Sequence, residues 1–413
     1  MHRLGQVYEV INTMTDIQRG FLTLDNPVSH LPLTSPLNIR LNHIISHLPE
    51  LLRAGKLRQE VTALNAEMAN ATIDIDDGNI QQQNAAILIL LMIAQGYVWE
   101  NPCQPENMIP AILARNIYSL CKSQQRFPAL TYADYVLYNW KLKDSSKEIS
   151  LDNIEPLATF TGQSDEAWFI TIHVVIEAVC GKALEAAFQA SRLAHVVKTT
   201  HQPWSPTVEI QLCEYLEKIS LTLQEAMDIL SKMQDGCDPH FYWSTLRHYL
   251  NGWEKVKTDT DNDANHGVYF DGVVIHGKMP KFRYKGPSGA QSSIMPALDA
   301  ALGLNHDIDE MYQTLLAFQQ YMPPNHMLFI QVMKLSELKH LIQTINSSAL
   351  TEAWKNALHY LGVFRLEHLK LVQQYIYHPA EKQGLSTLDL TGTGGSPLSQ
   401  YLGSRYESTR NNS

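Results

Sequence analysis

Apolar residues recur along most of this chain at the spacing of an α-helix. In 168–190, 207–233 and 349–377 they repeat at i, i+3, i+4 and i+7, which places them on one face of a helix. The stretch 81–98 is apolar nearly throughout, as in a helix buried on all sides. Alternation typical of a strand is short and rare, with 268–275 as an example. The pattern therefore predicts an all-α fold.

The distribution of these helical segments predicts two domains and a tail. Residues 1–40 are rich in Pro, Thr and Asn and are expected to be irregular, with helical patterning beginning near Leu41. We assign 1–108 to a small helical N-terminal domain, 109–403 to a large all-α domain and 404–413 to a flexible tail. Two domains suit a chain of 413 residues, because a domain usually holds roughly 100–200 residues.

Composition and charge narrow the class of protein. The chain has 45% hydrophobic and 18% charged residues, as in a soluble globular protein, and its formal net charge is -10. An acidic balance argues against a nucleic-acid partner, because phosphate binding relies on Lys and Arg. The apolar run 85–94 has about half of the roughly 20 residues that a membrane-spanning helix needs, so we expect no membrane partner.

The cysteines and the N-terminus predict a cytoplasmic protein. The number of cysteines, 5, is odd, and no two have C-x-x-C spacing, which favours reduced thiols over disulfides or a zinc site. The first residues carry early charges and lack the apolar run of a signal peptide. The sequence favours no particular oligomeric state.

A histidine near the C-terminus stands on the apolar face of the predicted helix 361–377. A neutral imidazole on an apolar wall is a good ligand for haem iron, and Arg365, one turn before His368, is placed to reach a haem propionate. On this helix alone, a structural histidine satisfied by its neighbours in the core is the simpler interpretation. The residues that share the face are Phe364, Arg365, His368, Leu371, Val372 and Tyr375.

A second histidine, His173, lies among apolar residues on the helix that begins near Ser164. Phe169, Ile176 and Glu177 share its face, so the imidazole is placed to line the open side of a haem. There it can hydrogen-bond oxygen or a substrate N–H. Taken alone, this histidine too is more simply explained as structural.

A third candidate segment, 240–247, combines aromatic side chains with one cation. Such a combination can hold an aromatic amino acid, with Tyr242 and its neighbours against the side chain and Arg247 on the carboxylate. The alternative is a helix start that carries a surface arginine.

Other conspicuous motifs indicate no chemistry by themselves. The Gly-rich loops at 286–291 and 391–396 fit neither a dinucleotide-binding nor a Walker motif, so they indicate no nucleotide. Pro323 and Pro324 are expected to stop a helix, and we interpret His326 as structural.

Taken in order, these segments resemble the indoleamine 2,3-dioxygenase family. Each motif alone is weak, but their order over most of the chain is specific. The motifs that carry the resemblance are Arg19-Gly-Phe-Leu22, Ser46-His-Leu-Pro-Glu50, Tyr132-Ala-Asp-Tyr-Val-Leu137, Trp168-Phe-Ile-Thr-Ile-His173, Leu246-Arg247 with Tyr249-Leu-Asn-Gly-Trp253, Ser288-Gly-Ala-Gln-Ser-Ser293, Tyr321-Met-Pro-Pro324, Phe364-Arg-Leu-Glu-His368 and Gly392-Thr-Gly-Gly395.

The resemblance implies a two-domain helical fold with a b-type haem in the large domain. It also implies that O2 opens the indole ring of L-tryptophan or a related indoleamine to give N-formylkynurenine. His368 matches the proximal ligand of the haem iron. Arg365 matches the partner of a propionate, and Asp299 matches an acidic residue that supports haem binding. We expect a bacterial member of the family.

The resemblance also assigns the residues around the substrate. Arg247 matches the residue that binds the substrate carboxylate, and His173 is expected to orient the indole. Phe169 and Tyr242 match aromatic positions packed around the indole. The remaining matches are loop residues near the haem edge and the substrate amino group, Ser288, Gly289 and Thr393, and the pocket wall beneath the indole, Tyr132, Tyr135 and Val136.

Three departures from the family pattern bear on the substrate. His173 stands where mammalian members carry Ser, and it resembles the distal histidine of the related tryptophan 2,3-dioxygenases. Tyr242 stands where mammalian members have Phe, and Lys-Gly-Pro-Ser at 285–288 replaces a commoner loop. These departures leave open a haem enzyme that acts on another indole or a modified tryptophan. A non-catalytic protein that binds haem or indole is a further alternative.

Overall fold

A computed structural model describes residues 17–23, 25–200, 204–257, 266–304 and 310–385. Thr393, its Gly-rich loop and the predicted tail at 404–413 lie outside these residues. Within them the chain is mostly helical, and its strands are two or three residues long. The prediction of an all-α fold is therefore confirmed.

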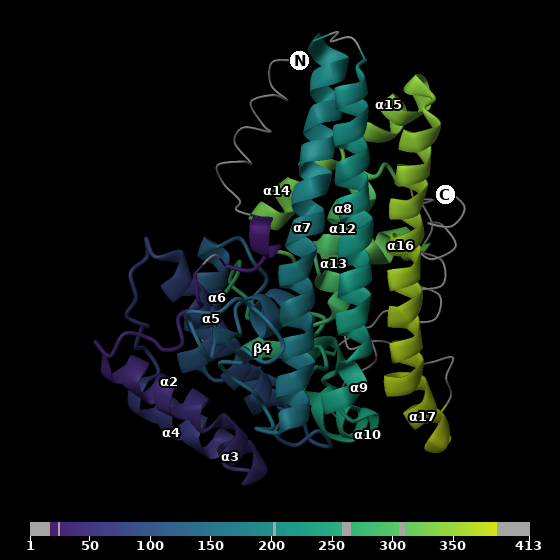
Figure 1. Ribbon diagram of the computed structural model, residues 1–413. Helices are drawn as coiled ribbons and strands as arrows, with labels where there is room; N and C mark the ends of the chain where they lie inside the picture. Colours follow the sequence, from purple (N-terminus) through teal and green to yellow (C-terminus); the bar gives the residue numbers. More distant parts are fainter. Residues whose placement is uncertain (1–16, 24, 201–203, 258–265, 305–309, 386–413) are drawn as a thin grey trace.

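Three long helices lie side by side and carry both predicted histidines (Figure 1). They are α7 (Ser164–Thr200), α8 (Pro206–Ser231) and α16 (Ser348–Val372), and α8 contacts the other two. Serine side chains define two of their starts, because Ser205 accepts from the backbone N–H of Val208 and Ser347 accepts from that of Leu350. The helices predicted from the apolar period are confirmed.

A second group of helices packs beside the lower part of α7 (Figure 1). It comprises α2 (Pro36–Ser46), α3 (Leu48–Arg53), α4 (Leu57–Met68), α5 (Ile80–Trp99) and α6 (Ala111–Ser123). Because α2, α3, α4 and α6 surround α5, all residues from 84 to 99 are buried, as the apolar stretch predicted. The predicted boundary between the two domains at residue 108 stays a prediction.

Helix α2 begins at Pro36, earlier than the expected start near Leu41. The side chain of Ser35 accepts from the backbone N–H of Asn38, and a proline in the first turn has the backbone φ of a helix already. This cap and proline outweigh the weak apolar period of the segment. The expectation that 1–40 is irregular is therefore wrong for its last residues.

Short elements fill the space between the long helices. The described residues form two small sheets. In the first, β1 (Met108–Ile109) pairs parallel with β4 (Val268–Phe270), which pairs antiparallel with β5 (Lys281–Phe282); in the second, β2 (Lys141–Leu142) pairs antiparallel with β3 (Ile154–Glu155). The short helical elements are η1 (Ile17–Arg19), η2 (Ala133–Leu137), α9 (Met233–Gly236), α10 (Pro239–Phe241), η3 (Tyr242–Leu246), α11 (Arg247–Tyr249), η4 (Trp253–Lys255), η6 (Gly289–Gln291), α12 (Ile294–Ala301), α13 (Glu310–Gln319), α14 (Pro324–Met333), α15 (Leu338–Ile345), η7 (Gln373–Tyr377) and α17 (His378–Lys382).

Helix α7 is the element that most resembles a membrane span. Among the described residues it is the one helix long and apolar enough to cross a bilayer by length and composition, and 61% of its apolar stretch is buried inside the protein. The helices α8, α12 and α15 and the short element η1 all contact it. Packing against these neighbours accounts for much of its apolar character.

A close crossing of backbones fixes α7 against the N-terminal part of the chain. A Cβ atom on Gly181 of α7 would lie 2.3 Å from the backbone nitrogen of Gly20 and 2.5 Å from the carbonyl oxygen of Gln18. Both distances are far below van der Waals contact, so only glycine fits at position 181. The segment that carries Gly20 is thereby held directly on the helix that carries His173.

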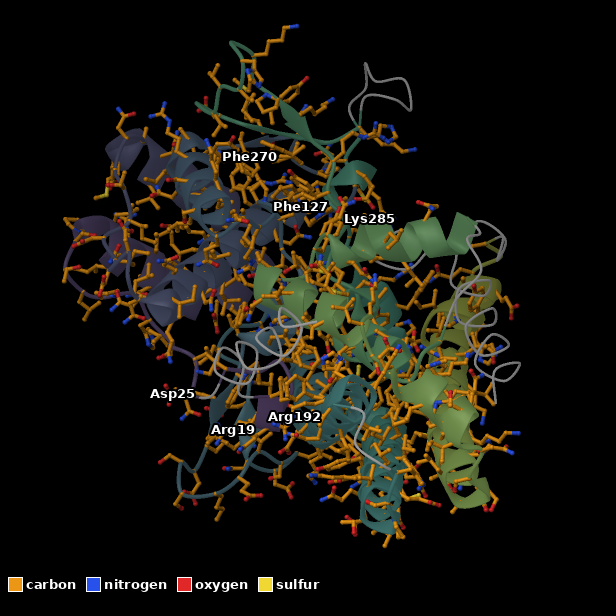
Figure 2. The ribbon with its side chains drawn as sticks, turned by 90° about the horizontal axis from the view of Figure 1, so that it is seen from above. Arg19, Asp25, Phe127, Arg192, Phe270 and Lys285 are labelled. Atoms are coloured by element: carbon orange, nitrogen blue, oxygen red, sulfur yellow. The ribbon has the colours of Figure 1, made fainter. Side chains whose placement is uncertain are left out.

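A row of aromatic rings supports the loop that follows β5. Phe127 stacks on Tyr284 at 4.8 Å between ring centroids, and Tyr284 stacks on Phe282 at 5.6 Å. Phe282 in turn contacts Phe270 at 4.6 Å, and the Lys285 ammonium lies 4.6 Å from the Phe318 ring on α13. Figure 2 shows this row from Phe270 through Phe127 toward Lys285.

Candidate active site

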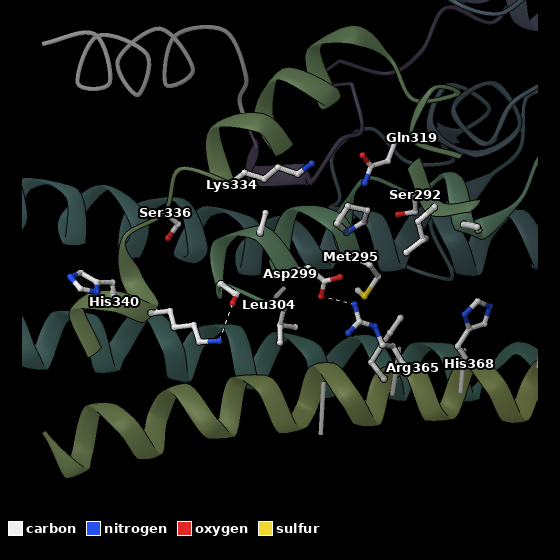
Figure 3. A pocket seen from close by; sticks show the side chains of 18 of the residues that line it. Ser292, Met295, Asp299, Leu304, Gln319, Lys334, Ser336, His340, Arg365 and His368 are labelled. Carbon is white, nitrogen blue, oxygen red and sulfur yellow. Dashed lines mark hydrogen bonds and ion pairs between the residues drawn. The ribbon is translucent and has the colours of Figure 1, made fainter. Parts of the chain in front are cut away.

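His368 points from α16 into a cavity of about 630 Å³, a volume typical of ligand pockets (Figure 3). Phe364 and Arg365 of the same helix also line it, and α12 contributes Met295 and Asp299. The face predicted from i, i+3 and i+4 spacing therefore does border a cavity.

The imidazole of His368 is neutral at physiological pH. Burial, and next the nearby His173, lowers the pKa of His368 to about 4. Within the residues that the structure describes, no hydrogen-bond partner engages either ring nitrogen of His368. An uncharged imidazole with a lone pair directed into a cavity is the form that binds a metal centre.

The loop that follows β5 approaches His368 closely. A Cβ atom on Gly289 would have the His368 Cε1 atom as its nearest neighbour, at 3.9 Å. Ser288 begins η6, and its hydroxyl accepts from the backbone N–H of Ala290 at 3.3 Å. The structure therefore places Gly289 beside His368, with Ser288 next to it in the chain, while the predicted contacts of both residues with haem and substrate stay predictions.

Gln291 and Ser292 fix this loop to the wall opposite α16. The Gln291 amide donates to the carbonyl of Gly286 at 2.9 Å and accepts from the backbone N–H of Tyr132 at 2.8 Å. The Ser292 hydroxyl donates to a carboxylate oxygen of Glu177 at 2.7 Å. Neither residue was a sequence candidate, because Tyr132 and Glu177, the partners that tie them to the opposite wall, lie more than 100 positions away in the chain.

These residues fit a haem group. The fit rests on the neutral His368 ring, whose nitrogens have no partner among the described residues, on a glycine at the loop facing it, and on the mostly apolar side chains of Met295 and Phe364 beside it. A buried arginine, Arg365, supplies positive charge one helical turn away.

Arg365 forms a buried ion pair with Asp299. Its Nη2 atom lies 2.6 Å from the Asp299 Oδ1 atom, and the two side chains are only 6% and 14% exposed. A guanidinium has five N–H donors in a planar fork, a geometry that suits it to bind more than one carboxylate. Asp299 thus acts directly on Arg365, while the haem contacts of both residues stay predictions.

His173 presents an acceptor nitrogen. Its Nδ1 atom lies 2.7 Å from the carbonyl oxygen of Phe169, one turn earlier on α7. Because a carbonyl can only accept, Nδ1 carries the proton and Nε2 keeps a lone pair. Burial lowers the pKa of His173, although the Phe169 bond opposes this effect, so the neutral tautomer prevails at pH 7.

Aromatic rings predicted to surround the substrate do lie together. The Phe169 ring lies 4.5 Å from His173 and 5.4 Å from Tyr242, and the Tyr132 ring lies 6.1 Å from His173, measured between centroids. Tyr375 extends the set, 5.7 Å from Tyr242. These rings form one aromatic wall, in which His173 lies between Tyr132 and Phe169.

Three short π-helical segments contribute to this wall. Tyr135 and Val136 lie on η2, Tyr242 on η3 and Tyr375 on η7. A π-turn inserts one extra residue into a helix, and such turns are frequent at functional sites. Helical period alone does not reveal them, so the sequence predicted uninterrupted helix at η7.

Two buried carboxyl groups of α7 hold the hydroxyls of the wall tyrosines. Tyr132 donates to Glu177 at 3.0 Å, and Tyr135 donates to Glu166 at 2.9 Å. Glu166 also accepts from the backbone N–H groups of Phe160 and Thr161, so its charge is well satisfied. The hydroxyls of both tyrosines therefore point into the protein, toward α7, while the Tyr132 ring faces His173 and the Tyr135 ring stacks on Phe160.

Glu177 differs from Glu166 in being poorly satisfied. Its Oε1 atom accepts from Tyr132 and Ser292, but its Oε2 atom is buried without a partner among the described residues. Burial raises the pKa of Glu177 to about 7, despite these two hydrogen bonds. The sequence placed Glu177 on the face of His173 but gave no sign of this environment.

Arg247 begins α11 beside the aromatic wall. Its guanidinium carbon lies 4.8 Å from the centre of the Trp243 ring, and its charge lowers the pKa of the neighbouring Tyr242 against the larger effect of burial. The structure thus brings the predicted carboxylate ligand next to Tyr242. Thr393, which was predicted to share the site, lies outside the described residues.

Comparison with known proteins gives one consistent result. The family model described as indoleamine 2,3-dioxygenase matches residues 12–412. Indoleamine 2,3-dioxygenase 1 of Rattus norvegicus is 28% identical over 95% of this chain and 92% of its own length. Indoleamine 2,3-dioxygenase nanC of Aspergillus nanangensis is 27% identical over 96% and 95%. The 6-hydroxytryptophan 2,3-dioxygenase fscD of Fusarium equiseti is 28% identical over 91% and 86%.

Proposed function

The chain belongs to the indoleamine 2,3-dioxygenase family, a family of haem dioxygenases, and from this premise we propose that it opens the indole ring of L-tryptophan or a related indoleamine to give N-formylkynurenine. The observation that carries the proposal is the pair formed by His368 and His173. Both imidazoles are neutral. They lie close enough together that a positive charge on His173 would disfavour protonation of His368. One is suited to an iron and the other to a substrate N–H.

His368 and Arg365 would hold the haem. The neutral imidazole of His368 would bind the iron, and Arg365, which pairs with Asp299, would bind a propionate. When bound, the haem supplies the oxygen chemistry that cleaves the indole ring. The protein contributes the position of the substrate and a site closed to water.

Arg247 and the aromatic wall would hold the substrate. The guanidinium of Arg247 pairs with the carboxylate, and Phe169 and Tyr242 pack against the indole. The Nε2 atom of His173 accepts the indole N–H, because its Nδ1 proton is already donated to Phe169. His173 therefore orients the ring and performs no proton transfer in this proposal.

A modified tryptophan is the second candidate substrate. Tyr242 places a phenol in the wall, and among the described residues no hydrogen-bond partner engages its hydroxyl. This group is able to bind a polar substituent on the indole. A relative at 28% identity is named a 6-hydroxytryptophan 2,3-dioxygenase, which supports this candidate.

Aerobic turnover tests both candidates. Reduced, haem-loaded protein is incubated with L-tryptophan or 6-hydroxytryptophan under O2, and products are identified by mass. The proposal predicts a product that contains the substrate plus both atoms of O2. Spectral changes on adding either compound, with no product, would instead support the non-catalytic binding protein.

A further inference from the structure

Gln95 is a polar residue inside the otherwise apolar core of α5. It is 2% exposed, and every polar group of its amide is used by one turn of the chain. Its Nε2 atom donates to the carbonyl oxygens of Tyr249 at 2.7 Å and Asn251 at 2.8 Å, and its Oε1 atom accepts from the Trp253 indole N–H at 2.9 Å. This turn, 249–253, begins at the last residue of α11, two positions after Arg247.

The same turn is attached to the loop that faces His368. The backbone N–H of Trp253 donates to the Tyr284 carbonyl at 2.8 Å. A Cβ atom on Gly286 would lie 2.1 Å from the Leu250 carbonyl oxygen, so the turn and the loop cross with no room for a side chain. Gln95 therefore holds a junction between the Arg247 segment and the 284–289 loop.

The energetics of burial explain why this contact matters. Burying an amide is unfavourable unless its hydrogen bonds are made. For packing within the core of α5 alone, an apolar residue at position 95 would therefore be more stable than glutamine. Gln95 is stabilised here only by the 249–253 turn. Removing the amide would leave two buried carbonyls and the Trp253 N–H without partners, each at substantial cost.

We propose that Gln95 is a positioning residue for substrate recognition: it fixes the turn after α11 and thereby holds the Arg247 guanidinium at the place of the substrate carboxylate. Gln95 touches neither substrate nor haem and acts through the 249–253 turn. The inference rests on the proposed function, because it takes Arg247 as the carboxylate ligand.

The first test separates positioning from general damage. Gln95→Met is prepared as haem-loaded protein, and spectral titration gives Kd for L-tryptophan and for tryptamine, which lacks the carboxylate. We expect Kd for tryptophan to rise about tenfold or more and Kd for tryptamine to stay within about twofold. A similar rise for both ligands, or for neither, would overturn the proposal.

Matched variants sharpen this result. Gln83→Met removes another glutamine amide from α5, one that contacts Gln124 and not the turn, and it should bind both ligands normally. Trp253→Phe removes one of the three hydrogen bonds and should give a smaller rise for tryptophan alone. In an Arg247→Met background, Gln95→Met should add little, because the two residues act on one interaction.

A second measurement needs no substrate. Amide hydrogen exchange of the ligand-free holoprotein should be faster in 247–256 of Gln95→Met and unchanged in 85–94. Unchanged exchange in 247–256 would overturn the proposal by itself. If the normal protein binds no tryptophan, the proposed function fails, and this exchange result still decides whether Gln95 fixes the turn.

Discussion

The Nη2 atom of Arg365 lies 2.6 Å from the Oδ1 atom of Asp299, which joins α16 to α12 one helical turn from His368. Buried pairs of this kind are sensitive to the loss of one partner, because the remaining charge stays buried and uncompensated. The effect on haem binding that the family resemblance implies for Asp299 would therefore act through the position and solvation of Arg365.

Asp299→Ala should weaken haem binding and lower stability by about 3–5 kcal/mol, since it removes the buried carboxylate that lies against the Arg365 guanidinium. The rate of haem loss to a scavenger protein and a denaturant titration measure the two effects. Glu155→Ala, which breaks the exposed pair with Lys141, is the control and should cost at most about 1 kcal/mol. Equal haem loss in the two variants would argue against a role for the buried pair.

His368→Ala should abolish haem incorporation, because the described residues offer no second neutral imidazole on that helix face. The absorbance of purified protein in the Soret region measures this directly. Added imidazole should restore part of the signal by entering the space left by the side chain. A normal Soret band and a five-coordinate ferrous spectrum without added imidazole would refute His368 as the ligand.

His173→Ala should reduce discrimination between tryptophan and 1-methyltryptophan, which has no indole N–H. The normal protein is expected to prefer tryptophan, because the Nε2 acceptor would otherwise lose its partner, at a cost of about 1–3 kcal/mol. Dissociation constants for the two compounds provide the comparison. If the ratio of the two constants is the same in the variant, His173 does not bind the indole N–H.

Glu177→Gln should stabilise the protein above pH 7 and remove part of its pH dependence. The folded protein holds a proton on Glu177 up to a pKa of about 7, whereas the unfolded chain loses it near 4.5. The folded state therefore binds more protons between these values, and its stability falls as the pH rises through that window and stays lower above it. Carrying the charge at pH 8 costs roughly 3 kcal/mol.

Denaturant titrations of the holoprotein between pH 4.5 and pH 8 test the Glu177 prediction. Glutamine can still accept from Tyr132 and Ser292 through its oxygen, so the hydrogen bonds are kept. Parallel stability curves for Glu177→Gln and the normal protein would show that Glu177 is already ionised at low pH.

Gly181→Ala should destabilise the protein by about 1–3 kcal/mol, the usual range for overpacking a core. The added Cβ would meet the backbone of Gln18 and Gly20, which has no flexible side chain to move aside. Thermal unfolding measures the loss. Lys182→Ala, which breaks an exposed ion pair next along the helix, should change the midpoint little.

The spacing of apolar residues predicted the long helices well. A buried helix face needs apolar residues at i, i+3 and i+4, and this pattern can be seen in the sequence without knowing which element packs against it. The His368 face and its Arg365 neighbour were visible for the same reason. Contacts between distant parts of the chain could not be predicted in this way. Asp299 and Arg365 are 66 positions apart in the sequence, and Glu177 and Ser292 are 115 positions apart. Gln95 interrupts an apolar stretch, but the turn at 249–253 that binds its amide lies more than 150 positions away, so the sequence alone did not single it out.

Because of the three π-turns, the aromatic wall depends on the number of residues in these short segments as well as on the identity of the side chains. One residue more or less in an α-helix rotates everything beyond it by about 100°, so each π-turn is an insertion that resets the direction of the residues after it. Deleting one residue from η3 would carry Arg247 away from the wall with its side chain intact. The specificity of this site can therefore be altered by insertions and deletions that leave every named residue in place.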